Sequence, residues 1–340
     1  MSARTKRGAA TTEQPPANVC FYRPGDEEGM LHVLQASFPR WPEVETNVAP
    51  IDHLRWKLAG AALPERNHIV AEANGEIIAV RIGWVQRYSG RLPTLSCRLD
   101  VDSAVLSDWR GRGVYSGITS FGVEMATDAD AVFASTGRPS LLQLDRELGH
   151  RPIKNGMVSM VCDLPTTPLA QRTNDSFKIT YAGSFDERTE GFWQEASRPF
   201  EFIARPSRDD LNWRYCDGRG GIGALLLAEE ASELLGFVVL RVSRATGYIA
   251  YLLALPDRLD VVRGLASAAL SRLRDSSVAA AVCALPRRHP YRSVLAEQGF
   301  TRKGHAIPLT CRPNAPDIDL SFLQEPKAAV HLMLGDTDLV

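Results

Sequence analysis

The sequence predicts an α/β (α+β) protein of two tandem units, each a mixed, mostly antiparallel sheet flanked by helices. Three observations support this: a length of 340 residues, a repeated helix–strand–strand pattern, and a composition with 44% hydrophobic and 23% charged residues. A chain this long exceeds what one hydrophobic core usually serves. The composition is typical of globular proteins. We therefore expect two domains of ordinary size.

The repeat is seen first in two short helical segments. Asp-His-Leu-Arg-Trp-Lys-Leu at 52–58 recurs as Asp-Asp-Leu-Asn-Trp-Arg-Tyr at 209–215. Two apolar runs follow each copy, and in the first copy an Asn74-Gly75 dipeptide separates them. Asn-Gly between apolar runs is a strong hairpin signal because both turn residues need positive φ. The pattern predicts two copies of one unit, with chance similarity of two amphipathic segments as the alternative.

The ends of the units set the expected domains. Each unit closes with a helix followed by a glycine, Gly149 in the first and Gly299 in the second, and glycine is typical after a helix end. A polar, proline-bearing stretch between the units is the natural linker. We expect a disordered tail at 1–18, a first domain at 19–165, a linker at 166–176, a second domain at 177–312 and an extension at 313–340.

Two further expectations concern the last apolar run of the chain and the two tryptophans of the repeat. The apolar run 328–334 is predicted to return and cover a sheet edge. Trp56 and Trp213, which mark the repeat, are predicted to be core residues.

Charge and cysteine usage exclude several classes of protein. Lys plus Arg (39) nearly balance Asp plus Glu (40), which argues against a nucleic-acid partner. The six cysteines have no CxxC spacing, so we expect reduced thiols and no metal site. No apolar run reaches the roughly 20 residues of a membrane span, and residues 1–18 lack the apolar core of a secretory signal. We expect a cytoplasmic protein without a membrane partner; the sequence does not indicate its oligomeric state.

One segment of the first unit carries the pattern of an anion site. A predicted β-strand from Leu95 to Leu106 leads into the turn Arg110-Gly-Arg-Gly-Val114 and then into a helix. Gly111 and Gly113 let the backbone approach a ligand, and the N–H groups and dipole of the helix start favour an anion. The turn predicts a phosphate or pyrophosphate site, with a ligand-free glycine turn as the alternative.

This turn resembles the acetyl-CoA pyrophosphate loop of the GNAT N-acetyltransferase superfamily, usually written Q/R-x-x-G-x-G/A. The order of elements over residues 20–162 is similar to that family as well. Tyr115 departs from it, since glycine or alanine is usual there. The resemblance implies an acyl-CoA co-substrate, with acetyl-CoA as the first expectation, and a pantetheine arm paired with backbone groups. The implied coenzyme-binding residues are Val105, Leu106, Arg110, Gly111, Arg112, Gly113, Val114, Tyr115 and Ser116.

The resemblance also implies direct acyl transfer, in which a neutral amine attacks the thioester. A carboxylate suits the role of base, and Asp100 and Asp102 are the candidates. Alternation along a strand predicts that both point to one face, with solvated carboxylates as the alternative reading. Asp145 stands where the family often has the tyrosine that protonates the thiolate. Asp145, Tyr115 or a water is therefore the candidate acid, with departure of the unprotonated thiolate as the alternative. His150 is predicted to lie on the surface.

The second unit passes from strand to helix over residues 250–265 without the glycine turn, so it should hold no pyrophosphate and should instead wall the acceptor cleft. Tyr291 and Arg292 are candidates for that cleft or for the surface. The sequence therefore predicts an N-acyltransferase acting on a primary amine of a small molecule, such as an amino sugar or antibiotic-like metabolite. The alternatives are a non-catalytic acyl-CoA-binding regulator and a tandem-GNAT transferase that uses aminoacyl-tRNA.

Overall fold

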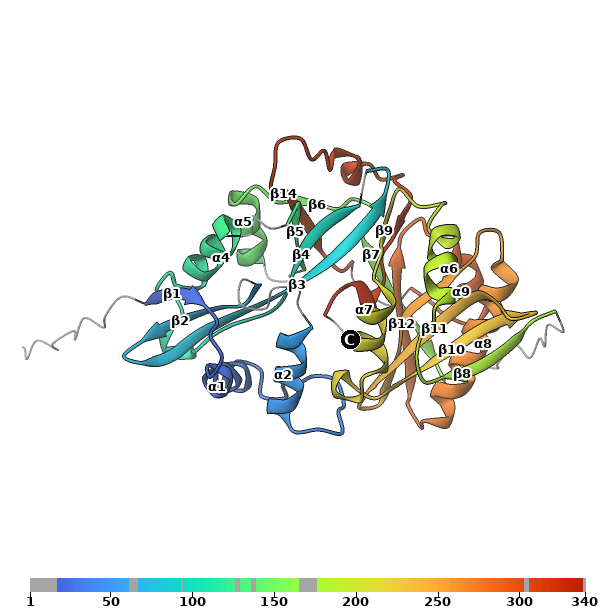
Figure 1. The fold of residues 1–340 in the computed structure, drawn as a ribbon, viewed down its shortest axis with the longest axis horizontal. Coiled ribbons are helices and arrows are strands. Elements are labelled where there is room, and N and C mark those ends of the chain that lie inside the picture. The colour runs from blue at the N-terminus through green and yellow to red at the C-terminus, as the bar shows by residue number, and fades with distance from the viewer. Residues whose placement is uncertain are drawn as a thin grey trace, which may run out of the picture.

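The protein consists of two α/β halves that lie side by side (Figure 1). The computed structural model describes residues 17–60, 67–92, 94–125, 129–135, 139–164, 176–302 and 306–338. Within these ranges each half has a sheet with helices packed on its faces, which confirms the predicted fold class and the tandem arrangement. The predicted tail up to residue 16 and the predicted linker up to residue 175 lie outside the described residues, whereas Asn18 already belongs to the first strand.

The first half follows the predicted order of elements. They are β1 (Asn18–Phe21), α1 (Glu27–Ser37), α2 (Pro50–Ala59), β2 (Ile69–Ala73), β3 (Glu76–Gly90), β4 (Leu95–Val105), α4 (Val114–Met125), β5 (Ala131–Ser135), α5 (Pro139–Glu147), β6 (Arg151–Pro152) and β7 (Met157–Asp163). Asn74 and Gly75 have φ angles of 54° and 80°, which confirms the hairpin between β2 and β3.

The second half repeats this order with a shorter helix in place of α2. It contains β8 (Lys178–Ala182), α6 (Arg188–Ala196), β9 (Phe202–Ala204), α7 (Arg208–Leu211), β10 (Gly223–Glu230), β11 (Glu233–Ser243), β12 (Thr246–Ala254), α8 (Leu259–Asp275), β13 (Ala280–Pro286), α9 (Tyr291–Glu297), β14 (Leu309–Pro313) and β15 (Val330–His331). Gly149 and Gly299 follow α5 and α9 with φ angles of 89° and 91°, as the glycine signals predicted.

Each sheet contains strands from the other half: β9, β14 and β15 of the second half belong to the first sheet, and β7 of the first half belongs to the second. The first sheet runs β1-β2-β3-β4-β5-β14-β6, and the second runs β7-β13-β12-β11-β10-β8. β14 from the second half pairs antiparallel with β5, and β7 from the first half pairs antiparallel with β13. Figure 1 shows β14, in red, among the green strands of the first half. The predicted ranges 19–165 and 177–312 therefore do not coincide with the two sheets.

Trp56 and Trp213 lie between the halves instead of each filling the core of its own half. Their rings stack with centroids 5.0 Å apart and an interplanar angle of 26°. Each indole N–H donates to the backbone carbonyl of the other residue, at 3.2 Å from Trp56 and 3.3 Å from Trp213. The pairing is reciprocal, as expected for equivalent residues of two repeats related by an approximate twofold axis.

The C-terminal extension returns to the first sheet and to the gap between the halves. β15 pairs in parallel with β9, and β9 pairs with the end of β3, which confirms that the run 328–334 covers an edge. The following turn, Leu334–Asp336, packs against β12. Asp338 therefore comes to lie beside α2, where it contacts Lys57.

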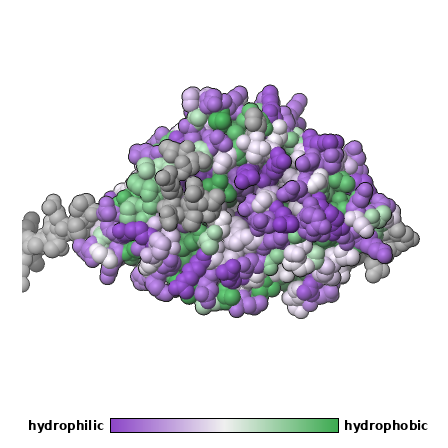
Figure 2. Space-filling model, viewed as in Figure 1, coloured by the Kyte–Doolittle hydropathy of each residue, from purple (hydrophilic) through white to green (hydrophobic). Residues whose placement is uncertain are grey.

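Apolar surface is not gathered on one element. The large apolar side chains that are exposed in the described part of the chain are Met125, Tyr181, Ile222 and Leu259. Figure 2 shows green residues interspersed with purple ones over the face in view. Among the described residues, no helix has both the length and the apolar character that a membrane crossing requires.

Candidate active site

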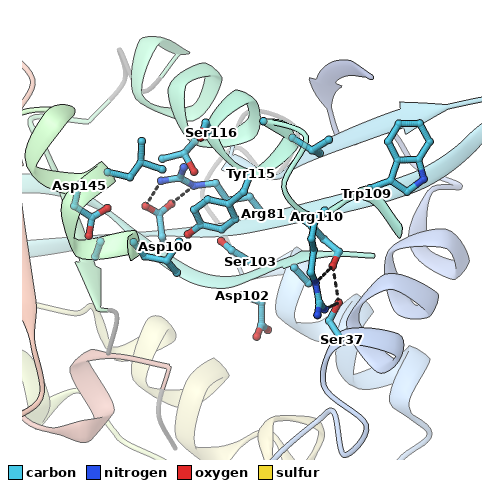
Figure 3. Close-up of a pocket in the computed structure, with 18 of the residues that line it drawn as sticks. Ser37, Arg81, Asp100, Asp102, Ser103, Trp109, Arg110, Tyr115, Ser116 and Asp145 are labelled. Atoms are coloured by element: carbon cyan, nitrogen blue, oxygen red, sulfur yellow. Dashed lines mark hydrogen bonds and ion pairs between the residues drawn. The ribbon is translucent and has the colours of Figure 1, made fainter. Parts of the chain in front are cut away.

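A cavity of about 720 Å³ opens where β4 and β5 separate. The two strands pair only from Cys97 to Asp100, opposite Ala131 to Ala134, and β4 then continues alone on that side. The lining includes Asp100 and Val105 of β4, the glycine turn between β4 and α4, and Leu144 and Asp145 of α5. Apart from Leu106 and Arg112, the residues predicted for coenzyme binding and those predicted for catalysis therefore meet around one cavity (Figure 3).

A bulge in β4 separates the two predicted base candidates. Asp100 lies opposite Gly83 of β3 and Asp102 lies opposite Ile82, so Val101 is an extra residue in the register. An extra residue reverses the alternation of side chains beyond it. The prediction that Asp100 and Asp102 share a face is therefore wrong: Figure 3 shows Asp100 turned towards Arg81 and Asp102 pointing away from it.

Asp100 is held in a buried ion pair. Arg81 Nε donates to Asp100 Oδ1 at 2.9 Å, Arg81 Nη2 contacts Oδ2, and Arg98 Nε lies 3.5 Å from Oδ1. Burial raises the pKa of Asp100, but the two guanidinium groups outweigh it and hold the pKa below its ordinary value. Both oxygens of Asp100 contact guanidinium groups, so Asp100 is not a solvated carboxylate. Its geometry fits a structural role in fixing the bulge.

Asp102 belongs to a second ion-pair cluster on the opposite face of β4. Lys57 Nζ of α2 lies 2.5 Å from Asp102 Oδ2 and 2.5 Å from Oδ2 of Asp338. Trp41 Nε1 donates to the same Asp102 oxygen at 3.1 Å. Burial lowers the pKa of Lys57, but the two carboxylates outweigh it, so the net shift is upward and Lys57 stays an ammonium. Burial raises the pKa of Asp338 to about 6 against the attraction of Lys57.

The glycine turn is open to solvent. Gly111, Arg112 and Gly113 are exposed, and the two glycines have φ angles of 73° and 78°, the left-handed region that favours glycine. α4 starts at Val114, and the first N–H groups of a helix have no acceptor within it. The turn thus presents N–H groups, the positive end of the helix dipole and the basic residues Arg110 and Arg112, which together suit a diphosphate.

The backbone beside the turn is only partly available for a pantetheine arm. Leu106 donates its N–H to Ile78 at 3.0 Å and its carbonyl accepts from Trp109, so both of its backbone groups already have a partner within the protein. Because hydrogen bonding alternates along an antiparallel pair, Val105 faces away from β3, towards the gap. The Val105 carbonyl accepts from Arg110 Nε at 3.0 Å and from Ser37 at 3.3 Å, both of which a pantetheine amide would replace.

Two proton-bearing side chains line the cavity opposite Arg81. Burial, followed by the charge of Asp100, raises the pKa of Asp145 to about 6. Asp145 Oδ2 and Arg81 Nη1 are buried without a hydrogen-bond partner among the described residues. Burial also raises the pKa of Tyr115, although Arg81 opposes the shift. Tyr115, Asp145 and Ser116 therefore lie where the sequence placed them, along one cavity.

The histidine that follows α5 is not on the surface as predicted. His150 is buried, and its Nδ1 lies 3.3 Å from the Thr310 hydroxyl of β14. Burial lowers the pKa of His150 to about 4. The exchanged strand β14 covers this residue, which explains why the sequence of the first half alone did not indicate burial.

The corresponding turn of the second half is unsuited to an anion. Arg258 precedes α8 and pairs with Asp260 in the first turn of that helix, at 2.9 Å. A carboxylate already occupies the helix start, where its charge interacts favourably with the dipole. Tyr291 and Arg292 are not at a cleft: Tyr291 is buried and its hydroxyl bonds the backbone of Ala254, and Arg292 bonds backbone carbonyls.

A second pocket, of about 260 Å³, lies between the halves and adjoins the first. It is called the inter-half pocket below. Its lining includes Trp41, His53, Lys57 and Trp84 of the first half, Arg214 of the second and Asp338 of the extension. Phe38, Val101 and Asp102 line both cavities, so the bulge of β4 forms the wall between them. Among the described residues, no group of three His, Cys, Asp or Glu side chains is placed to hold a metal.

Sequence reasoning missed three residues of the site: Arg81, Lys57 and Asp338. Arg81 is a charged residue inside the apolar run of β3, and this was the available signal for a buried ion pair. Lys57 was noted only as part of the repeat. Asp338 gave no signal, because it lies 281 positions from the lysine that it contacts.

No protein-family description and no curated protein sequence matches this chain, but solved structures do. A conserved Enterococcus faecalis protein, named as a probable N-acyltransferase, aligns with a TM-score of 0.67 and 11% identity over 88% of this chain and 73% of its own. A GCN5-related N-acetyltransferase from Kribbella flavida aligns with a TM-score of 0.61 and 15% identity, over 88% and 71%.

A third match repeats the two-unit arrangement. A tandem GNAT protein from the clavulanic acid biosynthesis pathway aligns with a TM-score of 0.59 and 14% identity, over 89% of this chain and 100% of its own. At these identities the likeness is one of fold. The chain therefore has the tandem fold of the GCN5-related N-acetyltransferases.

Proposed function

We propose that this protein is an acyl-CoA-dependent N-acyltransferase, with acetyl-CoA as the first donor to test and a primary amine of a small molecule as acceptor. One observation carries the proposal: the bulge of β4 has an acyl-CoA-sized cavity under a basic glycine turn on one side and a carboxylate-bearing pocket on the other. A transferase for two substrates needs two such sites that meet at the reacting atoms.

The described residues fit a coenzyme in the larger cavity. The exposed turn and the start of α4 would hold the diphosphate through their N–H groups, and Arg110 and Arg112 would add positive charge. Val105 would offer its backbone to the pantetheine arm along the free side of β4. The co-substrate supplies an activated acyl group as a thioester.

The residues around the reacting centre would move two protons. A carboxylate of the inter-half pocket would take the proton of the incoming ammonium, because only the neutral amine has a lone pair. Tyr115 or Asp145 would donate a proton to the sulfur as the carbon–sulfur bond breaks. The Arg81–Asp100 ion pair would keep the bulge, and therefore the wall between the two cavities, in place.

Calorimetric titration with acetyl-CoA tests the coenzyme site. We expect binding to the wild type and little binding to Gly113→Trp, because the left-handed backbone disfavours the indole-bearing residue and the side chain covers the turn. Gly183→Trp is the matched control: it makes the same change at a glycine with free space around it in the second half. Equal binding to both variants would remove the turn from the mechanism.

Release of the free thiol in the presence of amines tests the chemistry. We expect thiol release that depends on an added primary amine. We expect it to be reduced in Tyr115→Phe if Tyr115 is the proton donor and in Asp145→Asn if Asp145 is. Binding of acetyl-CoA without thiol release over a broad panel of amines would favour the regulator, the non-catalytic alternative.

A further inference from the structure

The inter-half pocket is smaller than the sites of drug-sized ligands and has room only for a small molecule. Its volume of about 260 Å³ lies below the roughly 300–1,000 Å³ of pockets for drug-sized ligands. The shared lining residues Phe38, Val101 and Asp102 place it directly behind the acyl cavity. A molecule in this pocket would lie within one strand's width of the thioester position.

The walls of the pocket are aromatic and form a continuous series of ring contacts. Ring centroids are 5.3 Å apart between Trp41 and His53, 5.1 Å between His53 and Trp56, and 6.4 Å between Trp56 and Trp84. Burial, followed by the charge of Lys57, lowers the pKa of His53 to about 4, so this wall carries no charge at neutral pH. Such walls suit a flat apolar group.

These rings also accept a positive charge. Lys57 Nζ lies 5.8 Å from the centroid of the Trp41 ring and 5.5 Å from that of the Trp84 ring. Indole faces attract ammonium groups at this range. The two indole rings therefore already stabilise one ammonium group in the pocket, that of Lys57.

Lys57 contacts one oxygen of each of two neighbouring carboxylates, those of Asp102 and Asp338. Its Nζ contacts Oδ2 of Asp102 and Oδ2 of Asp338, and Trp41 donates to Oδ2 of Asp102 as well. Among the described residues, no hydrogen bond or ion pair reaches Oδ1 of either carboxylate. The side chains are 13% and 17% exposed, so water or a ligand reaches them. Two adjacent acceptor oxygens match the N–H groups of a primary amine.

The charged groups around the pocket disfavour a second ammonium group and a carboxylate on the ligand. Arg214 stacks over Trp84 with its guanidinium carbon 4.3 Å from the ring centroid, and Arg241 donates to the backbone carbonyls of Tyr215 and Arg214. A second ammonium would meet these guanidinium groups. A carboxylate would meet Asp102 and Asp338, and Arg241 already has backbone partners.

We propose that the inter-half pocket binds the acceptor as a small primary monoamine with a flat apolar stem, and that the Oδ1 atoms of Asp102 and Asp338 receive its N–H groups. This inference rests on the proposed function and narrows its acceptor class. Lys57 is a positioning residue that holds the two carboxylates together. The amine nitrogen then faces Val101, the residue that separates the two cavities.

In this arrangement the acyl group passes from the thioester sulfur to the amine nitrogen. One carboxylate takes a proton from the bound ammonium, and the nitrogen lone pair forms a bond to the thioester carbonyl carbon. The carbon–sulfur bond breaks, its electron pair goes to sulfur, and the sulfur takes a proton from the acid of the acyl cavity. The second nitrogen proton leaves to the carboxylates or to water, so that the products are an amide, a free thiol and one released proton.

Binding without coenzyme tests the inference separately from the proposed function. Calorimetric titrations would compare 2-phenylethylamine with 2-phenylethanol, phenylalanine and 1,4-diaminobutane on the full chain. We expect 2-phenylethylamine to bind tightest. We expect Asp338→Asn to weaken its binding about tenfold or more, because one charge-assisted hydrogen bond is lost. Asp319→Asn, which changes an exposed carboxylate of the same extension, is the matched control and should bind like the wild type.

Lys57→Met tests the positioning role, with the thermal unfolding midpoint measured alongside. We expect weaker binding of the amine, whereas binding of acetyl-CoA stays within about twofold of the wild-type value in Asp338→Asn. The inference would be overturned by tightest binding of the alcohol, the amino acid or the diamine, or by an unchanged affinity in Asp338→Asn. Failure of acetyl-CoA to bind the wild type would instead count against the proposed function.

Discussion

Arg81 and Asp100 show why a residue of the right type at the right place need not have the predicted role. Asp100 lies on the strand where a base is expected, yet both of its oxygens contact Arg81, and its side chain is only 10% exposed. A carboxylate in such a pair is costly to leave without its partner. The roles of Asp100 and Asp102, which are two positions apart, differ because Val101 is an extra residue between them.

Replacement of Asp100 by Asn tests this structural role. We expect Asp100→Asn to lower the free energy of unfolding by about 3–5 kcal/mol, because it leaves the buried Arg81 and Arg98 without their carboxylate. Chemical denaturation measures the change. A variant that unfolds like the wild type but has lost transferase activity would return Asp100 to the role of base.

Asp145 predicts a pH dependence of stability. Its pKa in the folded protein is raised to about 6, so folding favours the protonated form. The stabilisation is complete below about pH 4 and is lost as the pH rises through 6. We expect Asp145→Asn, which cannot ionise, to gain stability relative to the wild type between pH 5 and pH 7.5. Unfolding midpoints that stay parallel over this range would contradict the assigned environment.

The coenzyme-loop residues were predictable from the sequence to a greater extent than the proton donors and acceptors. The pattern Arg110-Gly-Arg-Gly-Val114 is local, and the positive φ angles of its two glycines follow from their type. The ion pairs depend on contacts over long distances along the chain, such as 45 positions from Lys57 to Asp102. No local pattern carries that information, and Arg81 stood out only as a charge within an apolar strand.

The element that shapes the coenzyme site is the turn with the helix that follows it. Gly111 in the turn and Gly117 in α4 are both glycines with open surroundings, but only Gly111 has a positive φ angle. A Cβ at Gly117 would lie 3.7 Å from Val19, an ordinary contact. The same substitution at the two positions therefore separates backbone strain from helix propensity.

We expect Gly111→Ala to lower the free energy of unfolding by about 1 kcal/mol, because the left-handed region disfavours alanine. We expect Gly117→Ala to raise it by about 0.5–1 kcal/mol, because alanine favours the helix. Thermal unfolding of the two variants gives the comparison. The same sign of change in both would show that the turn is not held in its left-handed conformation.

The strand β4 shows that the alternation of side chains along a strand cannot be predicted past a bulge. Its length and start were expected, since the segment 95–106 is a long run of strand-forming residues with alternating apolar side chains. The bulge at Val101 was not, because its sequence has neither a glycine nor a proline to indicate it. It depends instead on tertiary packing on both faces of the strand, where Arg81 fixes one carboxylate and Lys57 the other.

At the scale of the whole molecule, the two halves pack tightly against each other. A Cβ on Gly60 would lie 1.8 Å from Trp213 Cζ2, and one on Gly220 would lie 2.5 Å from Trp56 Cζ2. The two glycines thus make way for the stacked tryptophans from opposite sides. Sequence reasoning identified these tryptophans as the mark of a repeat and as core residues, but it did not place them against each other, because a repeat does not reveal how its copies pack.

We expect Gly60→Ala to lower the free energy of unfolding by about 1–3 kcal/mol, since the methyl group overlaps the Trp213 ring. Gly191→Ala, in the exposed part of α6 with free space around the glycine, is the matched control and should not destabilise. Thermal unfolding followed by tryptophan fluorescence reports on the stacked pair as well. If Gly60→Ala were as stable as the control, the two halves would pack less closely than the stacked rings indicate.

The exchange of β7 and β14 bears on how the chain would behave if it were cut between its halves. Each piece would carry a strand whose hydrogen-bonding partners lie in the other piece, and each would lack a strand of its own sheet. Neither piece made alone would complete its sheet, whereas the two made together would restore both. In this respect the protein is a swapped dimer joined into one polypeptide, and a nick in the connection would leave a complex of two complementary fragments.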